Sequence, residues 1–279
     1  MALRQKLPLD PRAVYGVLKE LRKEAAEEKP LAVGGARELA AVLRRELAHG
    51  GVASAIREGG DAEGAAALVY VLVGDVDEED ERALHAASRV RVPIVCVLIG
   101  PGVSEQQAIP YVLAENVIRV QSGSGFPVEE IAHALARALG EKATPLAARL
   151  PVLRRAVCSA LIAKISRQNA LIGAAAFLPG ADLPPLTLNQ IRLVLRIADA
   201  YGFEIDRERL PEVLGVIGGG LGLRAIAREA LGAVPVAGWL LKGGIAYGGT
   251  HALGEAAVRY FEARAPVTRV AGARARFPR

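Results

Sequence analysis

The residues that could support catalysis are few and lie far apart in the sequence. None of the histidines has a partner at metal-ligand spacing, and no G-x-S-x-G turn supplies a nucleophilic serine. The most serine-rich loop is the short stretch 122–125, Ser-Gly-Ser-Gly. The sequence therefore favours a protein without catalytic activity, although residues that are distant in sequence can still meet in a folded site. The histidines are His49, His85, His133 and His251.

A phosphate-binding loop is incomplete in this chain. Such a loop needs Gly, Lys and Ser or Thr at fixed spacing after a strand, because backbone N–H groups cradle the phosphates and Lys neutralises them. Counted from Gly34, those positions hold Leu39, Ala40 and Ala41, and no Gly-Lys dipeptide occurs in the sequence. No G-x-G-x-x-G follows a predicted strand either. We therefore expect no nucleotide, no other cofactor and no metal ion.

The glycines at 122–125 precede a helix that is predicted to begin near Pro127. The N-terminus of a helix can bind an anion, so this loop is a candidate anion site. A turn that only caps the helix is the favoured interpretation.

Short apolar runs alternate with helical stretches between residues 29 and 140. Parallel strands need crossover helices, so this alternation predicts an α/β domain with a doubly wound, mostly parallel sheet. Its central strands, LVYVLV and IVCVLI, are uniformly apolar, as strands covered on both faces must be. The predicted strands are 31–33, 52–56, 68–73, 93–99 and 117–120, and the predicted helices are 36–48, 78–89 and 128–139.

An amphipathic helix at 12–28 precedes this domain, and helical periodicity dominates after it. The proline-containing stretch 141–150 is interpreted as a linker. An all-α, Gly-rich helical domain then covers 151–263, packed separately from the sheet, and a mobile basic tail covers 264–279. Its predicted helices are 151–177, 187–201, 210–231 and 236–263.

From residue 65 onward, the order of elements resembles the second half of a small bacterial GTPase domain. The matching segments are ALVYVLVGD, DEEDERAL, VPIVCVLIGPG and ENVIRVQSGSGFPVEEIAHAL. The family ends the third segment in Asn-Lys-x-Asp, whose Asp reads guanine, but Ile99, Gly100, Pro101 and Gly102 stand there in this chain. Gln121-Ser122 replaces the family's Ser-Ala. The resemblance implies a degenerate P-loop GTPase-like fold without GTP binding.

The stretch ISRQNALIGAAAFLPGADLPPLTLNQIRLVLRIADAYG resembles domain of unknown function 697. This helical domain is fused to, or encoded beside, bacterial GTPases and also occurs in YcjF-like membrane proteins. The later stretch PVAGWLLKGGIAYGGTHALGEAAVRYF is similar to the closing pattern of that family. The resemblance covers about 150–263 and implies a GTPase-linked or membrane-linked context, with no established reaction. The matching residues include Asn169, Pro179, Asp182, Pro185, Thr187, Gln190, Arg192, Thr250 and Glu255.

Several of these residues are expected to make structural or partner contacts instead of forming a ligand site. Thr187 is placed to cap a helix, and Asp182 lies among prolines in a turn. Arg196 could pair with Asp199 on one helix face. Asn169 lies in an apolar helix, where a buried amide needs a partner. The full set of candidate contact residues is Asn169, Asp182, Thr187, Gln190, Arg192, Arg196, Thr250 and Glu255.

Small residues four positions apart predict that helices of this domain approach each other closely. The longest uncharged runs there are 14, 11, 12 and 12 residues, at 168–181, 213–223, 230–241 and 243–254. A membrane-spanning helix needs roughly 20. A soluble core is favoured, while peripheral attachment to a membrane and insertion as an integral inner-membrane protein stay open. The small-residue pairs are Gly215/Gly219, Gly218/Gly222 and Gly244/Gly248, with Ala246/Thr250/Gly254.

Charge is divided unevenly along the chain. The formal net charge is +5, but residues 1–140 carry 16 Lys/Arg against 20 Asp/Glu, whereas residues 141–279 carry 19 against 10. A basic, apolar domain suits an acidic protein or an anionic membrane surface, and nucleic acid is not expected because few aromatic residues lie among the basic ones. Cys96 and Cys158 are expected to be buried thiols in a reducing cytoplasm. The first twelve residues have no apolar core of signal-peptide length, so we expect that the chain is not exported.

These features favour a non-catalytic adaptor or scaffold, associated with a GTPase or another protein or peripheral at the inner membrane. A nucleotide-binding hydrolase with an atypical phosphate loop is the main alternative.

Overall fold

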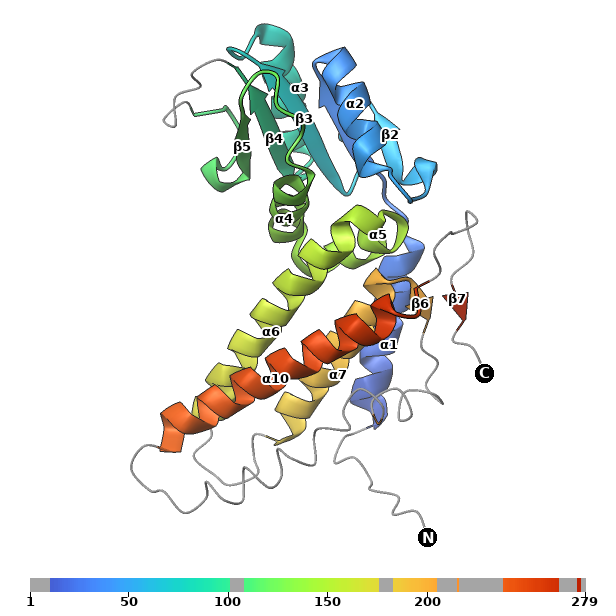
Figure 1. Ribbon diagram of the computed structural model, residues 1–279, viewed down its shortest axis with the longest axis vertical. Helices are drawn as coiled ribbons and strands as arrows, with labels where there is room; N and C mark the ends of the chain where they lie inside the picture. The colour runs from blue at the N-terminus through green and yellow to red at the C-terminus, as the bar shows by residue number, and fades with distance from the viewer. Residues whose placement is uncertain are drawn as a thin grey trace.

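The computed structural model describes residues 11–100, 108–175, 183–204, 215, 238–265 and 275–276. A five-stranded sheet lies at one end of the molecule, and long helices extend away from it (Figure 1). The helices are α1 (Pro11–Ala26), α2 (Arg37–Leu47), α3 (Glu78–Arg89), α4 (Val128–Leu139), α5 (Thr144–Arg149), α6 (Arg154–Ala175), α7 (Leu183–Ala200) and α10 (Gly238–Glu262). The strands are β1 (Leu31–Gly35), β2 (Ile56–Glu58), β3 (Ala67–Val73), β4 (Ile94–Ile99), β5 (Val117–Val120), β6 (Phe203–Glu204) and β7 (Ala275–Arg276). Short 3-10 helices are η1 (Ala53–Ala55), η2 (Ala114–Asn116), η3 (Gly140–Ala143) and η4 (Pro151–Leu153).

The sheet has the order β2-β1-β3-β4-β5, and every neighbouring pair is parallel. Leu31 of β1 lies opposite Ile56 on one side and Ala67 on the other. The chain reverses its direction across the sheet between β1 and β3, which is the 2-1-3-4-5 arrangement of flavodoxin-like doubly wound folds. The predicted α/β class with a parallel sheet is thus confirmed, whereas the GTPase-like character remains a prediction.

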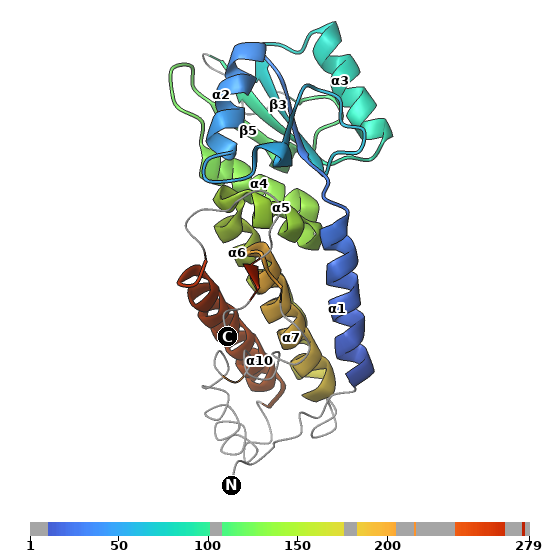
Figure 2. The same cartoon turned by 90° about the vertical axis from the view of Figure 1, so that its right-hand side faces the viewer.

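Alternate side chains of the strands enter two separate cores. Val69 and Val71 of β3 face α2 and α4, while Leu68, Tyr70 and Leu72 face α3. Figure 2 shows α2 and α3 on opposite sides of the sheet. Because both faces are covered, each central strand is apolar at every position instead of at every second one.

The acidic run before α3 serves as a helix cap. Asp77 accepts hydrogen bonds from the backbone N–H groups of Glu79 and Asp80, both at 2.8 Å, and the Asp80 side chain accepts one from Asp77 N–H at 3.2 Å. This capping box also places negative charge at the positive end of the helix dipole. Asp80 accepts a further bond from the Tyr70 hydroxyl at 3.0 Å, which ties α3 to the sheet.

The second strand begins later than the predicted 52–56. Ala53–Ala55 form η1, and β2 starts only at Ile56. The preceding residues are used to join the two halves of the chain, since Val52 N–H donates to the carbonyl of Arg149 at 3.0 Å. The Arg149 guanidinium in turn donates to the carbonyl of Lys29, just before β1. The helical half therefore meets the amino ends of the strands and leaves their carboxyl ends at the far end of the sheet.

The predicted linker and the predicted separate packing of the two halves are wrong. Residues 141–150 form most of η3 and all of α5, and Thr144, Leu146 and Ala147 are buried. One hydrophobic core runs from the α2 and α4 side of the sheet through α5 into α6, α7 and α10. The prolines of this stretch fit because Pro145 lies in the first turn of α5, where its missing N–H has no helical partner to lose.

The long helices α1, α6, α7 and α10 match the predicted segments 12–28, 151–177, 187–201 and 236–263 closely. The predicted helix 210–231 lies outside the described residues, apart from Gly215. The second half is not wholly helical, because β6 pairs in parallel with β7 from the tail that was expected to be mobile. Gly202, at φ +73, turns the chain out of α7, and Phe203 then packs against Phe261 with ring centroids 5.5 Å apart.

Small residues bring α6 and α10 close together, as the spacing predicts, but through partly different positions. A Cβ built on Gly173 would lie 2.9 Å from the Cβ of Ala246, and one built on Gly254 would lie 2.5 Å from Ile162. Among the described residues, no atom lies within 4 Å of a Cβ built on Gly244 or Gly248, so the close approach of α6 and α10 does not involve this pair. Both face outward on α10. Among the described helices, none has the length and apolar character needed to cross a membrane.

Candidate functional site

The candidate contact residues of the helical half are gathered into two buried polar clusters. Asn169, Gln190 and Thr250 meet between α6, α7 and α10. Arg192 and Arg196 meet carboxylates of α1 at the other side of α7. Of the three remaining candidates, Thr187 and Glu255 lie outside these clusters, and Asp182 lies outside the described residues.

The first cluster is an amide network around Asn169, which is completely buried. The Asn169 Nδ2 group donates to Thr250 Oγ1 at 2.9 Å, and its Oδ1 accepts from Asn189 Nδ2 at 2.8 Å. Gln190 Nε2 donates to the same threonine oxygen at 3.3 Å. Since a buried amide without partners is costly, this network satisfies Asn169 and fixes the register of three helices.

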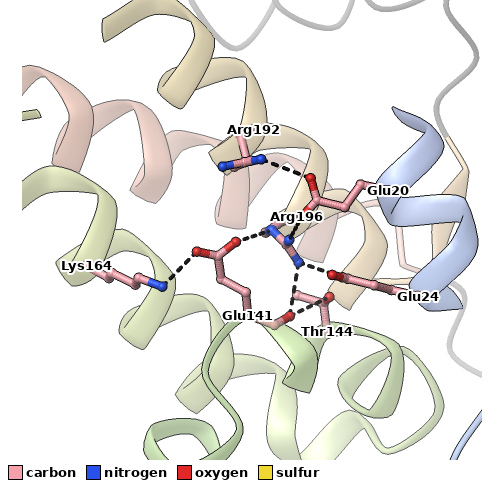
Figure 3. Close-up of polar contacts among 7 residues, drawn as sticks. All are labelled: Glu20, Glu24, Glu141, Thr144, Lys164, Arg192 and Arg196. Atoms are coloured by element: carbon pink, nitrogen blue, oxygen red, sulfur yellow. Dashed lines mark hydrogen bonds and ion pairs between the residues drawn. The ribbon is translucent and has the colours of Figure 1, made fainter. Parts of the chain in front are cut away.

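The second cluster, here called the arginine clasp, consists of Arg196, Arg192, Glu20, Glu24 and Glu141 (Figure 3). The Arg196 side chain is only 1% exposed. Its Nη1 atom lies 2.9 Å from Glu24 Oε2, its Nη2 atom 3.1 Å from Glu20 Oε1 and its Nε atom 2.8 Å from Glu141 Oε2. The contact between Arg196 Nε and Glu141 Oε2 is an ion pair that does not have the geometry of a hydrogen bond. A buried guanidinium is thus neutralised by carboxylates from two other elements.

Glu141 links the clasp to α6, because Lys164 Nζ lies 2.8 Å from its Oε1 atom. Burial alone would raise the pKa of Glu141, but the hydrogen bond from Lys164 and the charge of Arg196 outweigh burial and lower it below its usual range. The folded state therefore holds Glu141 ionised, and its contribution to stability is present above the pKa of an unfolded glutamate and is lost as the pH falls through the lowered value.

The three other candidate residues are Thr187, Glu255 and Asp182. Thr187 does not cap α7, because that helix begins four residues earlier, at Leu183, with Pro184 and Pro185 in its first turn. Glu255 lies half-buried on α10, outside both clusters. Asp182 lies outside the described residues.

Sequence reasoning missed the partners of these residues. Asn189 completes the amide network, and Glu20, Glu24 and Glu141 complete the clasp. One signal was available: Glu20 and Glu24 are four residues apart on α1, as Arg192 and Arg196 are on α7. Two helices with such matched, opposite charges can pair along one face, so this spacing could have linked them.

A nucleotide in a doubly wound sheet binds in the crevice at the carboxyl ends of the strands, where the strand order reverses. Here a cleft of about 340 Å³ lies at that point, beside Gly34 and Gly35. The glycines serve backbone packing: a Cβ on Gly34 would lie 2.6 Å from Gly60, and one on Gly35 would lie 2.1 Å from the carbonyl oxygen of Val71. Arg44 in this cleft is paired with Glu58. These glycines are therefore required by close backbone packing, and one arginine of the cleft is already paired within the chain.

The histidines do not form a catalytic group within the described part of the chain. His85 packs against the ring of Tyr111, and His251 stacks on Tyr247. The loop 122–125 forms a turn in which Ser124 N–H donates to the carbonyl of Gln121 at 3.1 Å, before α4 begins at Val128. Among the described residues, no three His, Cys, Asp or Glu side chains gather where they could hold a metal ion.

Comparisons of the chain with protein-family models, with curated proteins and with solved structures give no match. The two resemblances noted from the sequence thus remain predictions.

Proposed function

We propose that the protein is a non-catalytic adaptor whose basic helical half binds an anionic partner surface. The observation that carries this proposal is the difference between the paired and unpaired charges of that half. Two of its acidic side chains already have cationic partners within the folded chain, since Glu141 pairs with Arg196 and Lys164, and Glu204 pairs with Arg22.

The basic side chains, in contrast, are mostly left on the surface. Residues 141–175, 183–204 and 238–265 carry 11 Lys/Arg against five Asp/Glu. Several of the basic residues are exposed and have no ion-pair partner among the described residues. They are Lys142, Arg155, Arg167, Lys242 and Arg259. Such a surface attracts acidic protein segments and anionic lipids, at a rate and strength that fall with salt.

The internal use of the polar candidates argues against an enzyme. Asn169, Thr250 and Arg196 bind other side chains of the chain itself, and the glycines at the end of β1 bind backbone. A nucleotide-binding hydrolase would need a phosphate-loop Lys and a guanine-reading Asp, and the corresponding positions hold Ala40 and Gly102. The resemblance to a GTPase-associated helical domain further suggests a GTPase, or a protein beside one, as the partner.

Binding to polyanionic surfaces tests the proposal directly. The full chain is floated with phosphatidylglycerol liposomes and with neutral phosphatidylcholine liposomes, and is separately passed over immobilised poly-L-glutamate, at low and high salt. Binding to either anionic surface that is lost at high salt supports the adaptor, and the surface that binds more strongly indicates a membrane or a protein partner. Failure to bind both surfaces at low salt would reject the proposal.

A charge-reduced variant gives a matched control. Changing Lys142, Arg167, Lys242 and Arg259 to Gln should weaken binding at least tenfold, because each basic residue near an anionic membrane contributes about 1 kcal/mol. Changing the exposed Arg37 and Arg89 of the α/β half to Gln should leave binding within about twofold.

A further inference from the structure

A large cavity lies where the sheet meets the helical half, and neither cluster described above lines it. Its volume is about 870 Å³, within the range of pockets that hold small organic ligands. Five segments contribute to it. They are the C-terminal ends of α2, α7 and α10, the start of α4, and η4 together with the start of α6, which follows it directly. The lining residues are Arg45, Glu46, His49, Gly50, Val128, Pro151, Val152, Arg154, Arg155, Tyr201, Glu262 and Ala265.

Arg154 is a partly buried cation without an anion. Its guanidinium makes only two long hydrogen bonds, both 3.4 Å, to the carbonyls of Ala147 and Ala148, and it lies over the ring of Tyr201 at 5.5 Å. Within the described residues, no carboxylate lies at ion-pair distance from it. Burial lowers the pKa of Arg154, opposed only by the Tyr201 phenol and the Cys158 thiol. A charge removed from water in this way is normally compensated by an opposite charge.

The other two arginines of the cavity also make no ion pair among the described residues. Arg45 and Arg155 are exposed side chains that make no ion pair or hydrogen bond among the described residues, and His49 is exposed beside them. Glu46 and Glu262 supply the negative charge of the lining, so three guanidiniums face two carboxylates. The neighbouring arginine Arg44, in contrast, is paired with Glu58.

The rest of the lining is apolar. Val128, Pro151, Val152 and Ala265 lie between the charged groups, together with the ring of Tyr201. An occupant must therefore offer both an anionic group and an apolar body. A phosphate monoester carries nearly two negative charges, and guanidinium groups bind phosphate oxygens in a fork geometry.

We propose that this junction cavity binds a phosphate monoester with an aromatic or aliphatic body, held by Arg154, Arg155 and Arg45. The site goes beyond the adaptor role, because it is a cavity for one small group and not a charged surface. Since its lining comes from both halves of the chain, an occupant would also bridge the sheet and the helices.

Binding of 1-naphthyl phosphate to the full chain, measured by isothermal titration calorimetry, tests the site. Two controls test the parts of the probe separately: 1-naphthol has the aromatic body without the charge, and inorganic phosphate has the charge without the body. Each should bind at least tenfold more weakly than 1-naphthyl phosphate. Equal binding of 1-naphthol, or no measurable binding of 1-naphthyl phosphate, would overturn the proposal.

Arginine variants separate a binding role from a structural one. Arg154→Met keeps the apolar stem of the side chain, so the thermal unfolding midpoint should stay the same or rise. The variant should bind 1-naphthyl phosphate at least tenfold more weakly than the wild type. Arg155→Met and Arg45→Met, on exposed side chains that carry no folding risk, should weaken it about tenfold. Arg167→Met, on the same helix but away from the cavity, is the control and should bind as the wild type does. Unchanged binding in Arg155→Met and Arg45→Met would refute the assignment.

A competition arm distinguishes the two sources of such a phosphate. Phosphatidic acid vesicles that displace 1-naphthyl phosphate from the wild-type chain would assign the site to a lipid headgroup. Vesicles that bind without displacing the probe would assign it to a soluble phosphate ester.

Discussion

Two arginines that enter the interior of the molecule are treated in opposite ways. Arg196, in the arginine clasp, is surrounded by Glu20, Glu24 and Glu141. Arg154, at the junction cavity, has two carbonyls and a tyrosine ring as its partners among the described residues. The first is a completed structural contact between α1, α7 and η3. The second lacks a counter-charge among the described residues. A cation without a counter-charge at the wall of a cavity indicates a ligand more strongly than a buried polar residue does.

This contrast corrects a general expectation about polar residues in apolar helices. Asn169, Thr250 and Arg196 are the most conspicuous such residues in the sequence, yet the structure uses all three to join helices. Arg154 and Arg155 attract no attention in the sequence, because two adjacent arginines at the start of a helix match no binding motif.

Replacement of Arg196 should have the largest effect on stability. Arg196→Met removes the cation that the three carboxylates share and leaves Arg192 for Glu20 and Lys164 for Glu141, and we expect a loss of about 3 kcal/mol in the free energy of unfolding. The value is at the lower end for a broken buried pair because the glutamates keep partial access to water. Urea denaturation of the variant and of Arg167→Met measures it. A loss below about 1 kcal/mol would remove the contrast with Arg154.

Loss of the threonine hydroxyl in the amide network should cost less. Thr250→Val removes the acceptor for Asn169 Nδ2 and Gln190 Nε2 while keeping the side-chain shape, and we expect a loss of about 2 kcal/mol. Thr250→Ser keeps the hydroxyl and should lose much less. If both variants unfold at the same urea concentration, the hydroxyl is not what holds the network.

The smallest effects on stability are expected for two glycines of the α6–α10 pair. Gly173 lies in the contact between the two helices, and Gly244 lies on the outer face of α10. Gly173→Ala brings a methyl group against Ala246 and the carbonyl of Lys242, and should destabilise the protein by about 1 kcal/mol. Gly244 has no neighbour among the described residues at the position of a new methyl group, so Gly244→Ala should stabilise the protein by up to about 1 kcal/mol, since Ala is the better helix former. Thermal unfolding of both variants checks the difference in sign. The same sign in both would show that backbone propensity outweighs packing here.

The sequence predicted the elements well because each depends on local patterns. The apolar runs of β3 and β4 and the acidic start of α3 are visible within a few residues. β2 was displaced because the residues before it bond to Arg149, about 100 positions away, which no local pattern reveals. The predicted linker failed for the same reason, since its burial depends on helices that follow it.

The sites were less predictable than the fold. Asn169 and Arg196 were identified as residues that need partners, but the partners lie on other elements, and Arg196 meets Glu20 across 176 positions. The junction cavity draws its lining from five segments, and its character depends on which arginines remain unpaired after folding. That property cannot be read from any one stretch of sequence.

The clasp between α1 and α7 has a consequence for how the chain is made. Arg192 contacts Glu20 across 172 positions, and at a synthesis rate of roughly 5–20 residues per second this separation corresponds to about 10 to 30 seconds. During that interval the first helix has left the ribosome, while the helix that pairs with it has not yet been synthesised. Val17, Leu18 and Leu21, buried in the finished molecule, must wait for their partners in a nascent chain. A chaperone that shields this stretch would therefore act most strongly before residue 200 is translated.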